Sequence, residues 1–237
     1  MGVVTHGQAC PKIPVLVSKY SVMRRLALCL VFGLALTPLR YTARPAPPQQ
    51  SHPDAHQAFL ERLSLAAIER TKLVVRYDSG YVRIPYPNGD VPAGTGVCTD
   101  EVIRSYRALG IDLQKEVHED MQQNFSAYPN QRRWMLAHTD TNIDHRRVPN
   151  LQVFFSRRGE SLPVTANKAD YKPGELVTWD LGGNVPHIGI VVNKQSAAGR
   201  YLVEHNIGAG PKAEDVLFSW KITGHYRYFG PGGEAQH

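Results

Sequence analysis

The C-terminal third of the chain contains the pattern that most constrains the fold. Residues 176–179, 187–192 and 200–205 are rich in β-branched and aromatic side chains, and turn-forming segments separate them. Short strands that follow one another through turns pair in an antiparallel way. The chain is therefore expected to build an antiparallel sheet over about 175–229. Everything that precedes this sheet has to pack against it or remain outside the folded body.

Apolar residues recur at helical spacing in the part of the chain before the sheet. Val102, Tyr106, Leu109 and Leu113 are spaced 4, 3 and 4 residues apart, which is the stripe of an amphipathic helix. The same reasoning predicts helices at about 56–71, 98–109, 113–125 and 149–158. The predicted fold class is α+β, with helices first and the antiparallel sheet at the C-terminus.

The first 43 residues have the features of an export signal. Arg24 and Arg25 precede an apolar run of 11 residues, 26–36. This run is short for a helix that must cross roughly 30 Å of hydrocarbon. We therefore expect a cleaved signal peptide over 1–43, with Met23 as a possible true start, and a periplasmic or secreted mature protein without stable membrane insertion. A retained N-terminal anchor is the alternative.

Composition divides the remaining chain and excludes one class of partner. The proline-rich segment 44–57 is predicted to be a linker, 58–230 a single catalytic domain, and 231–237 a flexible tail. The net charge is +6, but from Arg44 onward there are 22 basic and 21 acidic residues. A net charge of +1 gives the folded body no field that would attract a polyanion, so nucleic acid is not an expected partner. We expect a monomer.

One cysteine stands out once the signal is removed. Of Cys10, Cys29 and Cys98, only the last remains in the mature protein, where it has no partner for an internal disulfide. It is either a buried inert thiol or a nucleophile. A glycine-containing turn places it at the start of a predicted helix, where the helix dipole favours the thiolate, although Asp100 and Glu101 oppose that effect.

Two histidines of the predicted hairpin supply the other groups that a thiol nucleophile needs. If the turn is centred on Ser196, His187 and His205 lie opposite each other on one face, although a slip of one residue would separate them. His187 would accept the proton of Cys98 and later return it to the leaving group. His205 would orient His187, with Asn206 as the alternative orienting residue.

Residues 111–172 contain a second group of polar side chains. The histidines and acids between His118 and His145 have spacings that a metal could use, but there is no HExxH motif or cysteine pair, and we expect no metal. Two adjacent arginines could clamp a substrate carboxylate, or they could have a structural role. The predicted substrate-binding residues are Asp100, Trp134, Arg146, Arg147 and Asn206.

Several motifs resemble those of the bacterial family known as domain of unknown function 1287. They are GVCTD (96–100), HEDM (118–121), NIDHRRVPNL (142–151), PHIGIV (186–191) and HNIG (205–208). The resemblance covers about residues 58–229. The family name implies no established activity.

A weaker resemblance connects the chain to NlpC-type papain-like cell-wall peptidases. It rests on Cys98 at a helix start, the Pro-Gly-acid-strand segment 173–177, the His-apolar-Gly-apolar segment 187–190 and His205. The insertion 111–172 and the missing Ser-x-Leu after the cysteine depart from that pattern.

The NlpC-type resemblance implies a papain-like core and a cysteine amidase or peptidase acting on amide bonds of the envelope. Peptidoglycan or another envelope peptide would be the substrate, and no cofactor would be needed. Backbone N–H groups around Cys98 would form the oxyanion hole. The alternatives are a non-catalytic module that binds envelope peptides and an acyltransferase built on the same core.

Overall fold

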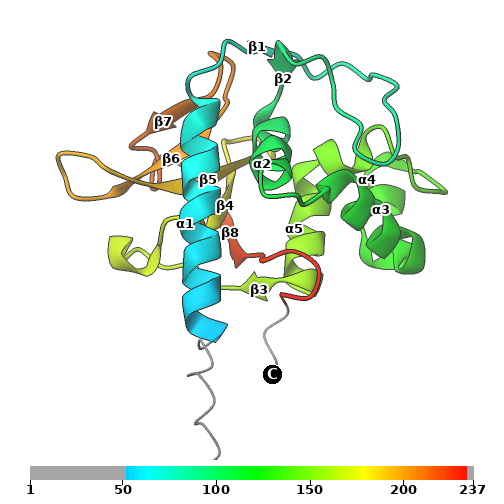
Figure 1. Ribbon diagram of the computed structural model, residues 1–237. Helices are drawn as coiled ribbons and strands as arrows, with labels where there is room; N and C mark the ends of the chain where they lie inside the picture. Colours follow the sequence, from blue (N-terminus) through cyan, green and yellow to red (C-terminus); the bar gives the residue numbers. More distant parts are fainter. Residues whose placement is uncertain (1–51, 234–237) are drawn as a thin grey trace, which may run out of the picture. The chain divides into compact units, whose positions relative to one another are not determined.

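A six-stranded antiparallel sheet with helices packed on one of its faces forms the body of the protein (Figure 1). The computed structural model describes residues 52–233. The predicted signal at 1–43, most of the predicted linker and the end of the predicted tail lie outside the described residues. No helix within 52–233 is both long enough and apolar enough to cross a membrane.

The sheet contains its strands in the order β3-β8-β4-β5-β6-β7. The bounds are β3 Glu160–Ser161, β4 Leu176–Asp180, β5 Pro186–Gln195, β6 Tyr201–His205, β7 Lys212–Glu214 and β8 Lys221–Arg227. A separate parallel pair joins β1 Arg76–Tyr77 to β2 Thr95–Gly96. The helices are α1 His52–Arg70, α2 Cys98–Arg107, α3 Leu113–Gln123, α4 Asn130–Trp134 and α5 Val148–Arg158, with 3-10 turns at Phe125–Ala127, Asp144–Arg146 and Lys168–Asp170. The predicted α+β class is confirmed.

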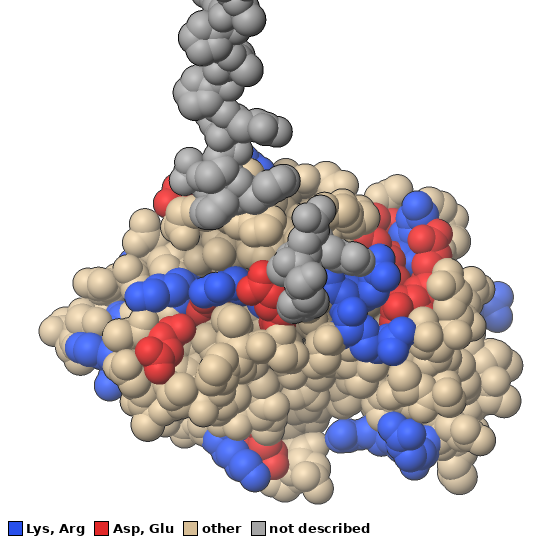
Figure 2. Space-filling view, turned by 90° about the horizontal axis from the view of Figure 1, so that it is seen from below, with Lys and Arg blue, Asp and Glu red and all other residues tan. Residues whose placement is uncertain are grey.

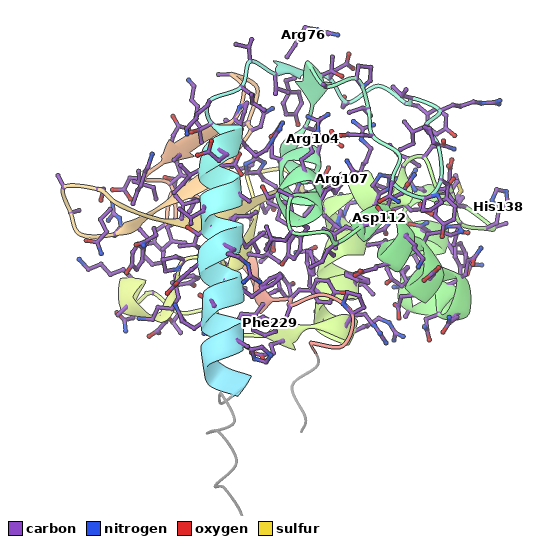
Figure 3. All side chains as sticks on the ribbon, viewed as in Figure 1. Arg76, Arg104, Arg107, Asp112, His138 and Phe229 are labelled. Carbon is purple, nitrogen blue, oxygen red and sulfur yellow. The ribbon has the colours of Figure 1, made fainter. Side chains whose placement is uncertain are left out.

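Helix α1 begins earlier than the sequence pattern predicts. It starts at His52, so residues 52–57 are helical rather than part of the predicted linker. A proline in the first turn of a helix costs no helical hydrogen bond, which allows Pro53 at this position. The beginning of α1 is also held by the His56 ring, which stacks on Phe229 with ring centroids 4.0 Å apart (Figure 3).

The main core lies between the helices and one face of the sheet. The predicted stripe of α2 is buried here, with Val102 and Tyr106 fully inaccessible. They pack with Ile188 and Ile190 of β5, and with apolar residues of α1, α3 and α5. The hydroxyl of Tyr106 donates a hydrogen bond to the Tyr228 carbonyl oxygen at 3.1 Å. This packing fixes α2, and with it Cys98, against β5.

The opposite face of the sheet has its own smaller core. Trp179, Val191 and Val203 pack there against Tyr171 and Leu217. The indole Nε1 of Trp179 donates to the Leu217 carbonyl oxygen at 3.0 Å. Alternate residues of a strand point to the same face, so residue 187 shares this face with Val191, and residue 188 faces the helices.

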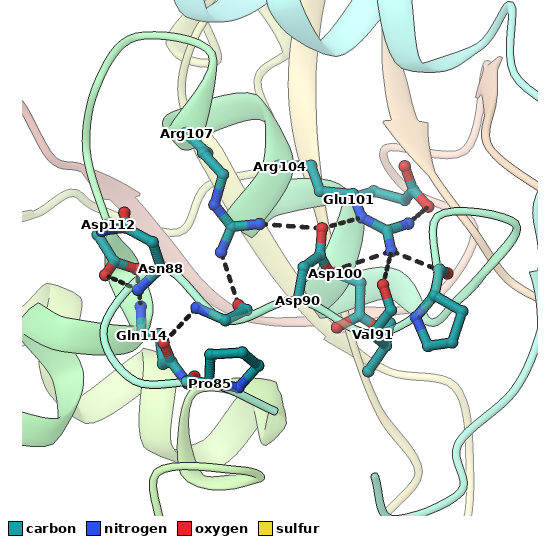
Figure 4. Close-up of polar contacts among 12 residues, drawn as sticks. Pro85, Asn88, Asp90, Val91, Asp100, Glu101, Arg104, Arg107, Asp112 and Gln114 are labelled. Carbon is teal, nitrogen blue, oxygen red and sulfur yellow. Dashed lines mark hydrogen bonds and ion pairs between the residues drawn. The ribbon is translucent and has the colours of Figure 1, made fainter. Parts of the chain in front are cut away.

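Residues 71–97 form a long connection, here called the strap, between α1 and the start of α2. Arg104 and Arg107 of α2 both pair with Asp90 of the strap, at 3.0 and 2.9 Å (Figure 4). The Gly89 N–H donates to Gln114 Oε1 of α3 at 2.8 Å. The strap is therefore fixed to the C-terminal half of α2 and to the beginning of α3.

Charged side chains of both signs alternate over the surface seen in Figure 2. No single-sign area dominates that view, in agreement with the near-balance of charge from Arg44 onward.

Candidate active site

Cys98 is the first residue of α2, as the sequence predicts. The preceding residue, Val97, is the N-cap, and its N–H donates to the Asp100 carboxylate at 2.7 Å. This hydrogen bond satisfies a donor at the helix start, in the way that a capping box does. Asp100 therefore helps to determine where the helix begins and where the thiol lies.

The thiol is buried in the resting structure. Cys98 is 5% exposed and belongs to the main core. Burial raises the pKa of Cys98 to about 12, although a hydrogen bond from the Ile188 N–H partly opposes this. The expected preference for thiolate at the helix start is therefore reversed, because desolvation outweighs the helix dipole. Tyr77 of the strap lies nearby: burial, and then Cys98, raise the pKa of its phenol.

The hairpin has a different register from the one predicted, but its side chains point to the predicted faces of the sheet. Val191 pairs with Val203 and Ile190 with Glu204, which places residue 205 across from 189 rather than from 187. The prediction of directly opposed histidines is wrong by two residues, because the turn is centred near Ala198 and not on Ser196, and a bulge between Val192 and Gln195 makes up only part of that difference. A shift of two residues preserves side-chain direction. Both histidines therefore remain on one face.

The two histidines are joined by a hydrogen bond. The Nε2 atom of His187 lies 2.9 Å from Nδ1 of His205. Of the two predicted orienting residues, His205 makes a hydrogen bond to His187, and which of the two orients the base stays a prediction. Asn206 is fully buried and its Oδ1 accepts from the Gly208 N–H at 3.1 Å, while its Nδ2 has no hydrogen-bond partner among residues 52–233.

Glu214 extends this pair and was missed by the sequence reasoning. Its Oε2 lies 3.1 Å from Nε2 of His205. A carboxylate only accepts hydrogen bonds, so it places the proton on Nε2 of His205 and leaves Nδ1 as an acceptor. Nε2 of His187 then donates, and Nδ1 of His187 retains its lone pair. Only the pairing of β6 with β7, in which Val203 lies opposite Glu214, could have identified this residue.

The histidines lie in an apolar enclosure. The rings of Trp179 and Trp220 lie 5.9 and 6.2 Å from that of His187. Burial lowers the pKa of His187 to about 3, with His205 as a second cause. Burial also lowers the pKa of His205, and Glu214 opposes that change. In the resting structure both imidazoles are neutral at pH 7, which a general base requires of His187.

The thiol and the candidate base lie beside consecutive residues of β5 whose side chains point to opposite faces of the sheet: Cys98 packs in the main core with Ile188, and His187 lies next to Trp179 on the other face. The Ile188 N–H is close enough to the thiol to lower the pKa of Cys98, and His187 is the residue before Ile188. Within the part of the chain that the structure describes, no hydrogen bond joins the thiol to the His187 ring. The catalytic assignment of Cys98, His187 and His205 therefore stays a prediction.

Asp100 and Arg146, both predicted to bind substrate, form a buried ion pair. Arg146 Nε and Nη2 donate to the two carboxylate oxygens of Asp100 at 2.8 and 2.9 Å. Arg146 also donates to the carbonyl oxygens of Gly80 and Asp78 in the strap, at 3.1 and 3.3 Å. These contacts give the pair a structural role between α2, the strap and the insertion, and its role in substrate binding stays a prediction.

Arg147 and Trp134, also predicted to bind substrate, contact each other. The Arg147 guanidinium lies 4.4 Å from the centre of the Trp134 ring, which is cation–π geometry. Arg147 Nη1 also pairs with Asp144 at 3.0 Å. Both side chains are partly exposed, so they could still contact a ligand.

No metal centre is found in the described part of the chain, where no three histidine, cysteine or acidic side chains come together to hold an ion. Asp120 pairs with Arg157 at 2.8 Å, and Asp144 accepts from Asn130 at 2.9 Å. His138 lies on an outer loop (Figure 3). The polar residues of the insertion are thus used mainly in pairs that hold it to the helices.

Comparison with known proteins identifies the family. Residues 64–228 match the model described as Domain of unknown function (DUF1287), and the chain belongs to that family. It is 52% identical over 153 residues to the uncharacterized protein YijF of Escherichia coli (strain K12), which covers 65% of this chain and 74% of YijF. The resemblance inferred from the motifs is thereby confirmed.

Two solved structures from Trichomonas vaginalis are similar to the chain at low identity. NlpC2 is 14% identical with a TM-score of 0.39, and the match covers 72% of this chain and 46% of that one. NlpC1 is 16% identical with a TM-score of 0.39, over 71% of this chain and 44% of that one. The chain thus spans less than half the length of either structure.

Proposed function

We propose that the protein is an exported cysteine amidase or peptidase that acts on amide bonds of the cell envelope, with peptidoglycan as the preferred substrate. The observation that carries the proposal is the hydrogen-bonded series His187–His205–Glu214, from which we infer a tautomer of His187 whose Nδ1 is free to accept a proton. Cys98, the one cysteine within residues 52–233, begins a helix and lies beside Ile188, the residue that follows His187 in β5.

The proposed reaction follows from these groups. Nδ1 of His187 takes the thiol proton, and the sulfur of Cys98 attacks the amide carbonyl carbon. Backbone N–H groups at the start of α2 stabilise the oxyanion. The amine leaves with the proton held by His187, and a thioester remains on the sulfur. Water, deprotonated by His187, then attacks the thioester; the C–S bond breaks, the acid is released, and His187 returns the proton to the sulfur of Cys98.

Burial of the thiol determines what else the reaction requires. With a pKa of about 12 for Cys98 and about 3 for His187, proton transfer between them is unfavourable in the closed arrangement. Displacement of the strap around Tyr77 by substrate would hydrate the thiol and move its pKa toward its ordinary range. The strap therefore acts in this proposal as the element that must move before chemistry.

The burial of Cys98 also favours one alternative, a module that binds envelope peptides without cleaving them. An acyltransferase would form the same thioester and pass it to an amine instead of to water. The experiment that separates the three is incubation of the mature protein with peptidoglycan fragments, with and without an added amine, followed by mass spectrometry. Hydrolysed fragments made by wild type and not by Cys98→Ala support the amidase.

Binding without any product would support the module, and fragments joined to the added amine would support the acyltransferase. Cell fractionation followed by N-terminal sequencing tests export. A mature protein outside the cytoplasm that begins after about residue 36 is the expected result. A full-length cytoplasmic product alone would contradict it.

A further inference from the structure

A groove between α5 and β8 is not used by the proposed chemistry. It consists of two hollows of about 130 and 500 Å³ that share Pro149, Gln152 and Thr223. We call it the α5–β8 groove; in Figure 1 these two elements lie next to each other. Other lining residues are Arg132, Arg133, Arg157, Val153, Pro186 and Tyr226.

Three consecutive residues of β5 connect the groove to the candidate active site. Pro186 lines the smaller hollow, His187 is the candidate base, and the Ile188 N–H reaches the thiol. A strand advances about 3.3 Å per residue, so the end of the groove lies within about 10 Å of the reacting groups. The smaller hollow therefore ends beside the candidate base, one residue before it in β5.

The rim of the groove carries two arginines without an acidic partner among residues 52–233, and the lining also contains one carboxylate, that of Asp180. Arg132 and Arg133 are exposed, and their hydrogen bonds go to the carbonyl oxygens of Ser126 and Asn184 at 3.4 and 3.3 Å. Neither forms an ion pair with an acidic side chain of residues 52–233. Arg157, by contrast, is paired with Asp120. Two arginines are thus available to a carboxylate.

The floor of the groove offers groups that suit a peptide backbone. Gln152 Nε2 donates to the hydroxyl oxygens of Thr178 and Thr223 at 2.9 and 3.1 Å, which orients the amide. Its Oε1 is then left as an acceptor for a ligand N–H. The prolines, Val153 and Tyr226 supply apolar walls. A bare anion would use only the arginines, whereas an acidic peptide would use all three kinds of group.

We propose that the α5–β8 groove binds an extended, carboxylate-bearing segment of the peptide substrate, with Arg132 and Arg133 holding its carboxylates. This inference rests on the proposed function, because it assigns the chemistry of the substrate. It also assigns a function to the insertion 111–172, because that segment provides both arginines and all of α5.

The test measures binding, with Cys98→Ala protein so that turnover does not interfere. The probes are the peptide Ala-Glu-Ala-Glu-Ala, its Gln counterpart, and inorganic phosphate as competitor. The double variant Arg132→Gln/Arg133→Gln is compared with Arg83→Gln/Lys194→Gln, which removes the same charge from exposed positions outside the groove lining. Circular dichroism confirms that each variant is folded.

The acidic peptide is expected to bind about tenfold more tightly than the Gln peptide, and the groove variant to lose that difference. In the control variant the ratio of the two affinities should stay within about twofold of its original value. Equal binding of the two peptides, an unaffected groove variant, or displacement of the peptide by phosphate at equal concentration would overturn the inference.

Failure of the groove and failure of the proposed function give different results. If the groove inference alone is wrong, cleavage that depends on Cys98 persists while binding ignores the two arginines. If the proposed function alone is wrong, the arginines still control binding, but no product depends on Cys98.

Discussion

His187 and His205 are hydrogen-bonded at 2.9 Å although they lie diagonally across β5 and β6. This diagonal hydrogen bond is possible because Gly189, and not a larger residue, lies opposite His205. A Cβ atom built on Gly189 would lie 2.6 Å from the Glu204 carbonyl oxygen and 3.1 Å from Cβ of His205. The missing side chain thus permits the close approach of the two strands on which the pair depends.

Replacement of Gly189 by alanine is expected to destabilise the protein and to disturb the histidine pair. The added methyl group meets backbone, which cannot yield as a flexible side chain would, so we expect a loss of about 1–3 kcal/mol in the free energy of unfolding. Gly94→Ala is the control, because a Cβ there meets nothing within 4 Å. Urea unfolding measures both, and equal stability of the two variants would refute the explanation.

The two histidines should differ in their effect on turnover. His187→Ala removes the base and is expected to abolish product formation, whereas His205→Ala leaves an imidazole that can still reach the thiol part of the time. Steady-state assays on peptidoglycan fragments compare the variants. Full activity of His187→Ala would show that the assignment is wrong, and equal losses would show a more tightly coupled unit than proposed.

The Asp100–Arg146 pair should contribute strongly to stability because both charges are buried. Asp100→Asn leaves the guanidinium without its charged partner, and a loss of about 3–5 kcal/mol is expected. Asp100→Asn combined with Arg146→Met should cost less than the sum of the two single changes. A double-mutant cycle by urea unfolding measures this coupling, and strictly additive effects would contradict the pair's role.

Acid should weaken the fold through buried neutral histidines. Burial lowers the pKa of both His145 and His187 to about 3, against 6.5 for the free side chain. Between these values the unfolded chain binds protons and the folded chain does not, so stability is complete above pH 6.5 and falls toward pH 3. Each histidine contributes up to about 1.4 kcal/mol per pH unit.

His145→Gln tests this pH dependence at a distance from the proposed chemistry. Urea unfolding between pH 7 and pH 4 measures how steeply the free energy of unfolding falls with pH. The fall should be shallower for this variant than for wild type, because the variant takes up as much as one proton fewer on unfolding. The same slope in both proteins would mean that His145 takes up its proton while folded.

Local patterns predicted the helix that carries Cys98 and the face that carries the histidines. The stripe of Val102 and Tyr106 depends on helical spacing alone, and the shared face of His187 and His205 depends on the period of two in a strand. Both are properties of short segments. The sequence reasoning therefore succeeded for α2 and for the direction of the hairpin side chains.

Features that depend on distant residues could not be predicted in the same way. The bulge after Val192 changes the register without leaving a clear trace in composition. Glu214 reaches His205 only because β7 pairs with β6, and Asp100 finds Arg146 across 46 positions of the chain. The burial that raises the pKa of Cys98 likewise arises from tertiary packing, which no local motif encodes.

Activation of Cys98 by His187 is tested most directly with a peptide that carries an electrophilic ketone in place of the scissile amide. Intact-protein mass spectrometry follows its attachment to wild type, His187→Ala and Cys98→Ala, first in the native proteins and then in urea. We expect attachment at Cys98 in native wild type, at least about 100-fold slower attachment in His187→Ala, and equal rates for these two in urea. Equal rates in the native proteins, or no attachment to native wild type, would contradict the account.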